Sequence, residues 1–144
     1  MSHDLIIKKI EQMKILMTEL GELLTLSFSE FKSRFTNIRS AERNYQLLIE
    51  LASDINAHLI AELGGETPDT YRESFKKMTE LDVLDKKHIT DFIKSSNLRN
   101  ILIHEYDFDE DNFIFYKSAK EFMPLYEYYI VSIQNHLKSN KNLN

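Results

Sequence analysis

The chain has 144 residues, no cysteine and a formal net charge of -5, which excludes disulfides and argues against nucleic-acid binding through a broad cationic surface, although a small local phosphate site stays possible. Because no stretch approaches the roughly 20 apolar residues of a membrane span, and the charged start MSHDLIIKKIEQMK lacks the apolar core of a signal peptide, we expect a cytoplasmic protein with no membrane partner. Only three glycines and two prolines interrupt the chain, which favours long helices.

Hydrophobic spacing predicts the first two helices. Apolar residues recur every three or four positions over residues 6–24, and again within a helix of about Asn37 to Leu63 that the glycine pair at 64 and 65 ends. Two such stripes are expected to pack on each other. The segment SFSEFKSRFTN is expected to be a short link, with Phe28, Phe31 and Phe35 pinning the turn to the core. The predicted stripes are Ile6, Ile10, Met13, Met17, Leu20 and Leu24, then Ala41, Tyr45, Leu48, Ala52, Ile55 and Leu59.

A short third helix and a longer fourth one are predicted from their caps. Pro68 suits a helix start, and Thr70 with Glu73 offers a capping box. Asp85 is the expected N-cap of the fourth helix. The inward positions of that helix are expected to be Ile89, Phe92, Ile93, Leu98, Ile101 and Leu102.

The C-terminal part begins with the acidic segment DFDEDN, which is interpreted as a loop or a helix start. A last helix is predicted from about Phe115 to Leu137, kinked or broken at Pro124, before a frayed tail at about 138–144. Residues 1–144 are therefore expected to form one all-α domain, an antiparallel bundle of four main helices with a short additional helix. The last helix should face inward through Ala119, Phe122, Leu125, Tyr129 and Ile133, while Tyr126, Tyr128 and Tyr129 are interpreted as packing residues with hydroxyls in water.

Neither metal nor cofactor is expected from the sequence. The sequence has no Gly-rich phosphate loop, no nucleophile elbow and no His-Glu-x-x-His pair. The acidic DFDED lacks the glycine and the distal glutamate of a calcium loop. The five histidines are dispersed, with no two of them three or four positions apart.

Polar residues interrupt the apolar pattern near the end of the fourth helix, in the stretch LRNILIHEYDFDED. Ser96, Asn100 and His104 are spaced to form one polar stripe, and Arg99 lies about 100° around the helix from Asn100. Arginine binds phosphate oxygens in a fork, and histidine exchanges a proton near neutral pH. A structural explanation stays open: Arg99 could pair with the acids that follow, and the helix dipole could stabilise His104.

The pattern R-x4-H-x-Y in RNILIHEY resembles the signature of the HepT-like toxins, a branch of the HEPN superfamily of small helical ribonucleases. The segment ERNYQLLIELASDINAHLIAELG looks like the second helix of that family, and TPDTYRESFKKMTELDVLDKK looks like the stretch that leads into its motif helix. The resemblance covers about residues 4–135. Two departures are Asp82, where relatives often have glycine, and DFDED, which is more acidic than expected beside an RNA site.

The resemblance implies the toxin of a type VII-like toxin–antitoxin pair of the HepT/MntA type. Such a toxin is a metal-independent endoribonuclease that cleaves mRNA or tRNA. Carried over by position, Arg99 and His104 are the catalytic pair and Asn100 is a supporting polar residue. The resemblance also implies a homodimer or higher homo-oligomer, and a minimal nucleotidyltransferase antitoxin that adenylylates Tyr106.

These roles fit the chemistry of the side chains. His104 would act as general base on a ribose 2′-hydroxyl, which attacks the adjacent phosphorus and leaves a 2′,3′-cyclic phosphate, while Arg99 holds the phosphate. AMP on Tyr106 would add bulk and negative charge where the RNA phosphate must bind. The alternative is a non-catalytic HEPN-like subunit that partners a minimal nucleotidyltransferase and contacts a nucleotide through Arg99. A third hypothesis is a purely structural bundle.

Overall fold

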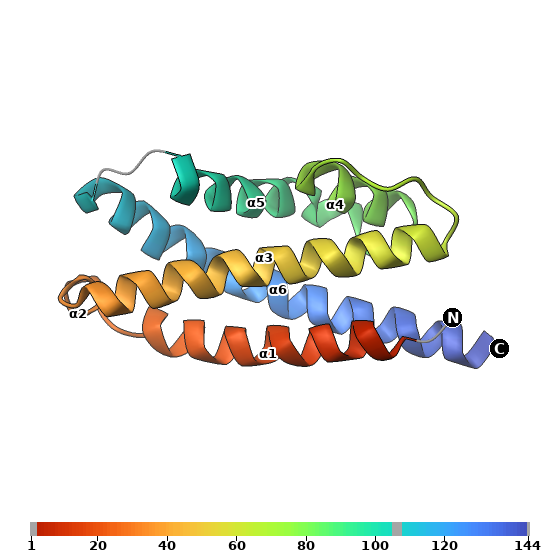
Figure 1. The fold of residues 1–144 in the computed structure, drawn as a ribbon, viewed down its shortest axis with the longest axis horizontal. Coiled ribbons are helices and arrows are strands. Elements are labelled where there is room, and N and C mark those ends of the chain that lie inside the picture. The colour runs from red at the N-terminus through yellow and green to blue at the C-terminus, as the bar shows by residue number, and fades with distance from the viewer. Residues whose placement is uncertain (1–2, 105–107, 144) are drawn as a thin grey trace.

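The fold is known from a computed structural model, which describes the backbone of residues 3–104 and 108–143 and the side chains of residues 3–98 and 111–139. Within these ranges every regular element is a helix. The four long helices lie side by side, with α2 at one end of the bundle (Figure 1). The predicted all-α bundle of four main helices is therefore confirmed. The elements are α1 (Asp4–Leu24), α2 (Phe28–Lys32), α3 (Phe35–Glu62), α4 (Tyr71–Glu80), the 3-10 helix η1 (Lys86–His88), α5 (Ile89–His104) and α6 (Phe108–Leu143).

The helices α1 and α3 form an apolar framework. Both predicted stripes are buried along their whole length, and none of their residues is more than 8% exposed. Fully burying one such large aliphatic side chain contributes about 1.5–3 kcal/mol relative to leaving it in water. The stability of this pair of helices therefore comes mainly from apolar contact, as their spacing predicts.

The helices α3 and α4 end in the same kind of turn but with different residues at its left-handed position. After α3, Gly64 has a φ of 85°, and the next N–H donates to the Ile60 carbonyl at 2.8 Å. After α4, Asp82 has a φ of 60°, and the next N–H donates to the Met78 carbonyl at 3.0 Å. This backbone conformation favours glycine, which accounts for the glycine that the resemblance leads one to expect at position 82.

The predicted helix starts at Thr70 and Asp85 are confirmed. The Thr70 hydroxyl accepts a hydrogen bond from the Glu73 N–H at 3.1 Å. The Asp85 carboxylate accepts one from the Lys87 N–H at 3.0 Å and thereby starts η1, which leads directly into α5. These caps determine where the chain enters the helix that carries the R-x4-H motif.

The helix α6 is longer than predicted at both ends. It begins at Phe108 rather than about Phe115, so the acidic segment is a helix start, one of the two structures considered for it. It continues to Leu143, beyond the predicted end at Leu137. Pro124 lies inside the helix, whose continuous assignment excludes a break there.

Two predictions about aromatic residues are wrong. Phe31 is fully buried and Phe28 partly buried, but Phe35 is 75% exposed. The predicted link is in fact the helix α2, and Phe35, as the first residue of α3, precedes the part of that helix that faces the core. The hydroxyls of Tyr126 and Tyr129 do not reach water, because both side chains are at most 1% exposed and bond to protein groups instead.

Candidate functional site

The helix α5 carries three of the four candidate site residues. Arg99, Asn100 and His104 lie in its last two turns, in a helix that is continuous from Ile89 to His104. Positions 96, 100 and 104 therefore fall on one helix face, as predicted. The side chains of these three candidates, and the whole of Tyr106, lie outside the described residues, so their mutual geometry stays a prediction.

A buried group of tyrosine and serine side chains, which we call the Ser95 cluster (Tyr45, Ser95, Tyr126), holds α5 one turn before Arg99. The Tyr45 hydroxyl of α3 donates to the Ser95 backbone carbonyl at 2.7 Å, and the Ser95 and Tyr126 hydroxyls are 2.7 Å apart. In a regular α-helix the carbonyl of residue 95 also accepts the N–H of residue 99. Tyr45 thus contacts the carbonyl to which the backbone of Arg99 bonds.

A second buried group, the Asn56 cluster (Asn56, Ser74, Tyr129), connects α3, α4 and α6. The Tyr129 hydroxyl lies 2.6 Å from the Asn56 side-chain oxygen and 3.0 Å from the Ala52 carbonyl. The Asn56 amide donates to the Ser74 hydroxyl at 3.0 Å. This cluster uses the same chemistry as the first one, but its hydrogen bonds do not reach α5.

The ring of Phe92 separates the two clusters. It stacks on Phe75 of α4 with centroids 4.7 Å apart and an interplanar angle of 10°, and it meets Tyr126 and Tyr129 edge-on at 5.8 and 6.0 Å. Phe92 is fully buried. The inward face of α5 is therefore fixed against both α4 and α6.

Burial raises the pKa of all three tyrosines of the clusters, Tyr45, Tyr126 and Tyr129. They are thus neutral hydroxyls near neutral pH, suited to donating hydrogen bonds rather than to exchanging protons. From the sequence they were interpreted only as packing residues. The signal that could have found them is a polar residue within a buried face, such as Asn56 in the stripe of α3.

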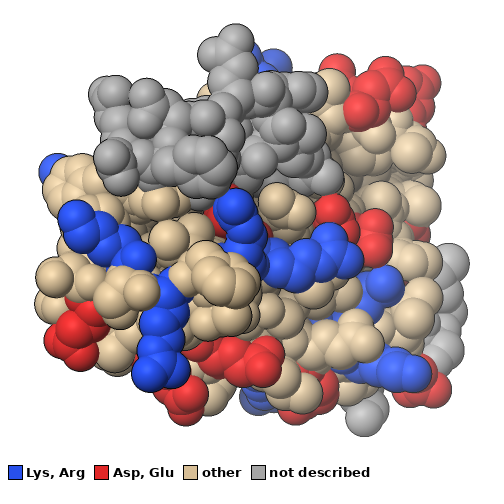
Figure 2. Space-filling model, turned by 60° about the vertical axis from the view of Figure 1, so that its left-hand side comes forward, with Lys and Arg blue, Asp and Glu red and all other residues tan. Residues whose placement is uncertain are grey.

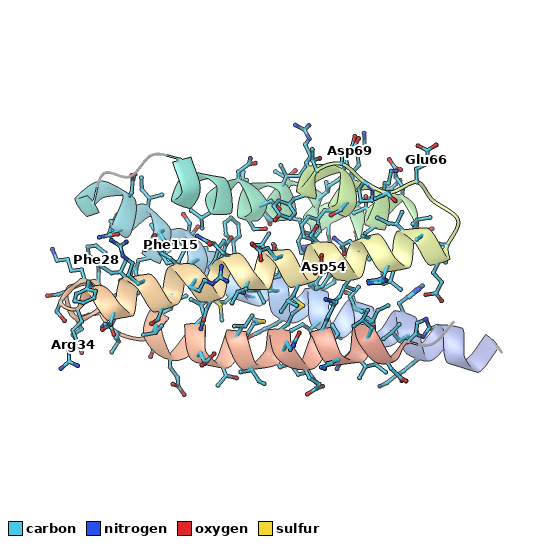
Figure 3. The ribbon with its side chains drawn as sticks, viewed as in Figure 1. Phe28, Arg34, Asp54, Glu66, Asp69 and Phe115 are labelled. Carbon is cyan, nitrogen blue, oxygen red and sulfur yellow. The ribbon has the colours of Figure 1, made fainter. Side chains whose placement is uncertain are left out.

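A groove of about 590 Å³ runs beside α5 and is lined by Ser53, residues 68–72, Ser96 and Asn97. Figure 3 shows Asp69 on the outer side of the segment before α4. Ser96 is only 3% exposed, and its hydroxyl donates to the Phe92 carbonyl of its own helix at 3.0 Å. The first residue of the predicted polar stripe therefore belongs to the wall of the groove rather than to the open surface.

The described histidines lie apart from the motif. His3 and Glu62 are joined at 2.8 Å, and burial lowers the pKa of His136, while Glu62 raises it and His3 lowers it. No three metal-binding side chains come together within the described part of the chain. None of the helices, as far as they are described, is long and apolar enough to cross a membrane.

Comparisons with known proteins place this arrangement in one family. A family model described as Ribonuclease HepT-like matches residues 7–133. The tRNA nuclease HepT of Aphanizomenon flos-aquae is 30% identical over 99 residues, which are 69% of this chain and 67% of that protein. The tri-AMPylated HEPN toxin of Shewanella oneidensis, solved in complex with its MNT antitoxin, is 25% identical, with a TM-score of 0.82 and coverage of 94% of this chain and 99% of that one. A toxin–antitoxin structure with AMP-PNP has the same identity and a TM-score of 0.80, over 93% of this chain and 98% of that one.

Proposed function

Because the chain belongs to the HepT-like ribonuclease family, we propose that it is the toxin of a toxin–antitoxin pair and cleaves RNA with Arg99 and His104. The observation that carries this proposal is the R-x4-H spacing at the end of α5, in a chain that matches the family over residues 7–133. An enzyme with this substrate acts where RNA is present, which is consistent with the expected cytoplasmic location. Since one relative is a tRNA nuclease, tRNA is the first substrate to test.

The proposed reaction is an internal transfer followed by release. His104 removes the proton of a ribose 2′-hydroxyl, the 2′-oxygen bonds to the adjacent phosphorus, and the bond to the 5′-oxygen of the next nucleotide breaks. The products are a 2′,3′-cyclic phosphate and a 5′-hydroxyl, which takes up a proton. Arg99 stabilises the extra negative charge on the phosphate oxygens, and Asn100 orients the imidazole.

The proposed regulation is adenylylation of Tyr106 by a nucleotidyltransferase antitoxin. The neighbour from Shewanella oneidensis is itself tri-AMPylated and bound to an MNT antitoxin. The tyrosines of the two buried clusters could not accept AMP without unfolding, because each is at most 1% exposed. AMP on Tyr106, two residues after His104, would oppose RNA binding by its bulk and charge. A homodimer or a higher homo-oligomer, which would bring two motifs together, is part of the same proposal.

The test is RNA cleavage by purified protein with and without the motif side chains. His104→Ala should lower the cleavage rate by about 10²- to 10⁴-fold, while circular dichroism shows an intact helical fold. Cleavage should persist in EDTA and leave the matching DNA strand uncut, because DNA lacks the 2′-hydroxyl. If the folded His104→Ala variant cleaves at the original rate, the proposed catalytic role is wrong.

The regulatory part needs a separate measurement. After co-expression with the nucleotidyltransferase, intact mass should show added adenylate on the wild-type chain and none on Tyr106→Phe. Adenylate that persists on Tyr106→Phe would reject the assignment. A chain that binds the nucleotidyltransferase and nucleotide but never degrades RNA would instead support the non-catalytic alternative.

A further inference from the structure

The end of the bundle that carries α2 has an unusual combination of side chains. We call it the α2–α6 surface and define it by Phe28, Lys32, Phe113, Tyr116 and Lys120. The Phe28 ring meets Phe113 edge-on at 5.1 Å and Tyr116 at 5.4 Å. Phe113 is still 47% exposed. Three contacting rings, one of them open to solvent, therefore lie where α2 packs on α6.

A lysine flanks these rings on each helix. The Lys32 ammonium lies 5.4 Å from the centroid of Phe28, and the Lys120 ammonium lies 5.4 Å from that of Tyr116 and donates to its hydroxyl at 3.5 Å. Both lysines are exposed, and among the described side chains neither forms an ion pair with an acid. Each ammonium is thus positioned over a ring while keeping its charge available to a ligand.

The charge of this end is opposite to that of the whole chain. Residues 28–34 and 113–121 contain four cations and two acids, a local charge of +2, whereas the whole chain carries -5. Figure 2, turned so that this end comes forward, shows Lys and Arg side chains gathered in a band across the face, and Figure 3 shows Arg34 pointing away from the bundle. The cations of the two segments are Lys32, Arg34, Lys117 and Lys120, and the acids are Glu30 and Glu121.

From these observations we infer that the α2–α6 surface binds single-stranded RNA, with phosphates at Lys32 and Lys120 and a base stacked on Phe113. Proteins that hold single strands combine cations along the backbone with exposed aromatic rings for the bases. A surface for an apolar partner would not need its cations kept free, and a flat duplex offers no base for the ring of Phe113. The inference rests on the proposed ribonuclease function, since it assigns a substrate contact outside the motif.

The distance from the motif helix suits one continuous strand. The helix α5 ends at His104, and the four peptide units to Phe108 span at most about 14 Å. Phe113 lies five residues further along α6, about 7.5 Å at 1.5 Å per residue. At about 3.4 Å per stacked nucleotide, a strand of roughly six nucleotides covers the whole distance. The α2–α6 surface would therefore hold nucleotides next to the cleaved bond.

Binding is best measured separately from cleavage, with a short single-stranded 2′-O-methyl RNA that lacks the attacking hydroxyl. Removing both lysines, Lys32→Gln with Lys120→Gln, should lower the slope of log affinity against log salt by about 1.4, from about 0.7 per lost phosphate contact on a single strand. The matched control is Lys8→Gln with Lys138→Gln, which changes the net charge equally but at the other end of the bundle. The control should leave the slope unchanged.

Phe113→Ala tests the ring independently of charge. It should weaken binding about 5- to 150-fold, the equivalent of 1–3 kcal/mol per stacked base, and leave the salt slope unchanged. The inference is overturned if the wild type does not bind the 2′-O-methyl RNA, or if the lysine pair and its control behave alike. It is also overturned if these variants lose only self-association or nucleotidyltransferase binding, which would make the surface a protein interface. A wild type that binds RNA in this manner but does not cleave it would refute the proposed activity and leave the surface standing.

Discussion

The Ser95 cluster and the Asn56 cluster use the same chemistry for different purposes. In each, a fully buried tyrosine hydroxyl bonds across helices to a backbone carbonyl, and Phe92 packs between them. The first cluster holds the helix that carries the R-x4-H motif, whereas the second holds α4, which carries none of the candidate site residues. The comparison teaches that similar burial and similar hydrogen bonds can contribute to stability alone, or to stability and to the position of a catalytic side chain.

What the clusters share should give the largest effect, at alkaline pH. Burial raises the pKa of Tyr45, Tyr126 and Tyr129, so above pH 10 the unfolded chain loses protons that the folded protein keeps. Stability should therefore be unaffected by these groups below pH 10 and fall as the pH rises above it, by up to about 1.4 kcal/mol per pH unit for each tyrosine. Urea unfolding at about pH 9 and about pH 11 measures this. Equal free energies of unfolding at the two pH values would contradict it.

Tyr129→Phe should separate stability from activity. The change removes the hydroxyl that Asn56 and Ala52 share and leaves the buried Asn56 oxygen without that donor, at a cost of about 1–3 kcal/mol. Because the Asn56 cluster does not bond to α5, kcat for RNA cleavage should stay at the wild-type value. Urea unfolding measures the first quantity and single-substrate kinetics the second. A fall in kcat as large as that of Tyr45→Phe would remove the distinction between the clusters.

Tyr45→Phe should show the opposite balance. The Ser95 carbonyl keeps its helical N–H partner, so the loss of stability should be only about 1 kcal/mol. The turn that leads to Arg99 loses its attachment to α3, and a small displacement of a catalytic group lowers kcat by on the order of tenfold. The affinity for 2′-O-methyl RNA, which does not report the reaction, should change little. An unchanged kcat would show that the Ser95 cluster only stabilises the fold.

The smallest effect is expected at the end of α4. Asp82→Gly relieves a left-handed backbone conformation and should raise the free energy of unfolding by a few tenths to about 1 kcal/mol. Asp82→Ala serves as the control and should lower it, because alanine adopts this conformation less readily than aspartate. Neither change should affect kcat, since α4 belongs to the side of the comparison that concerns stability.

Local features of the fold could be predicted from the sequence, and distant ones could not. The stripes of α1 and α3 follow from spacing within one helix, and the caps at Thr70 and Asp85 follow from neighbouring residues. Contacts across the bundle leave no such pattern: Tyr45 and Ser95 are 50 residues apart, and Tyr129 and Asn56 are 73 apart. The exposure of Phe35 depends on the unforeseen helix α2. The motif residues came from a resemblance, and only their place on α5 is now described.

The position of α6 in the chain has a consequence for synthesis. Each cluster takes one tyrosine from α6, Tyr126 in one and Tyr129 in the other, and α6 is the last helix in chain order. On a ribosome that adds about 5–20 residues per second, α1 and α3 can pair while both clusters are still incomplete. The motif helix would then emerge before its final attachment exists. A nascent toxin of this design would gain full cleavage activity only after its translation is nearly finished.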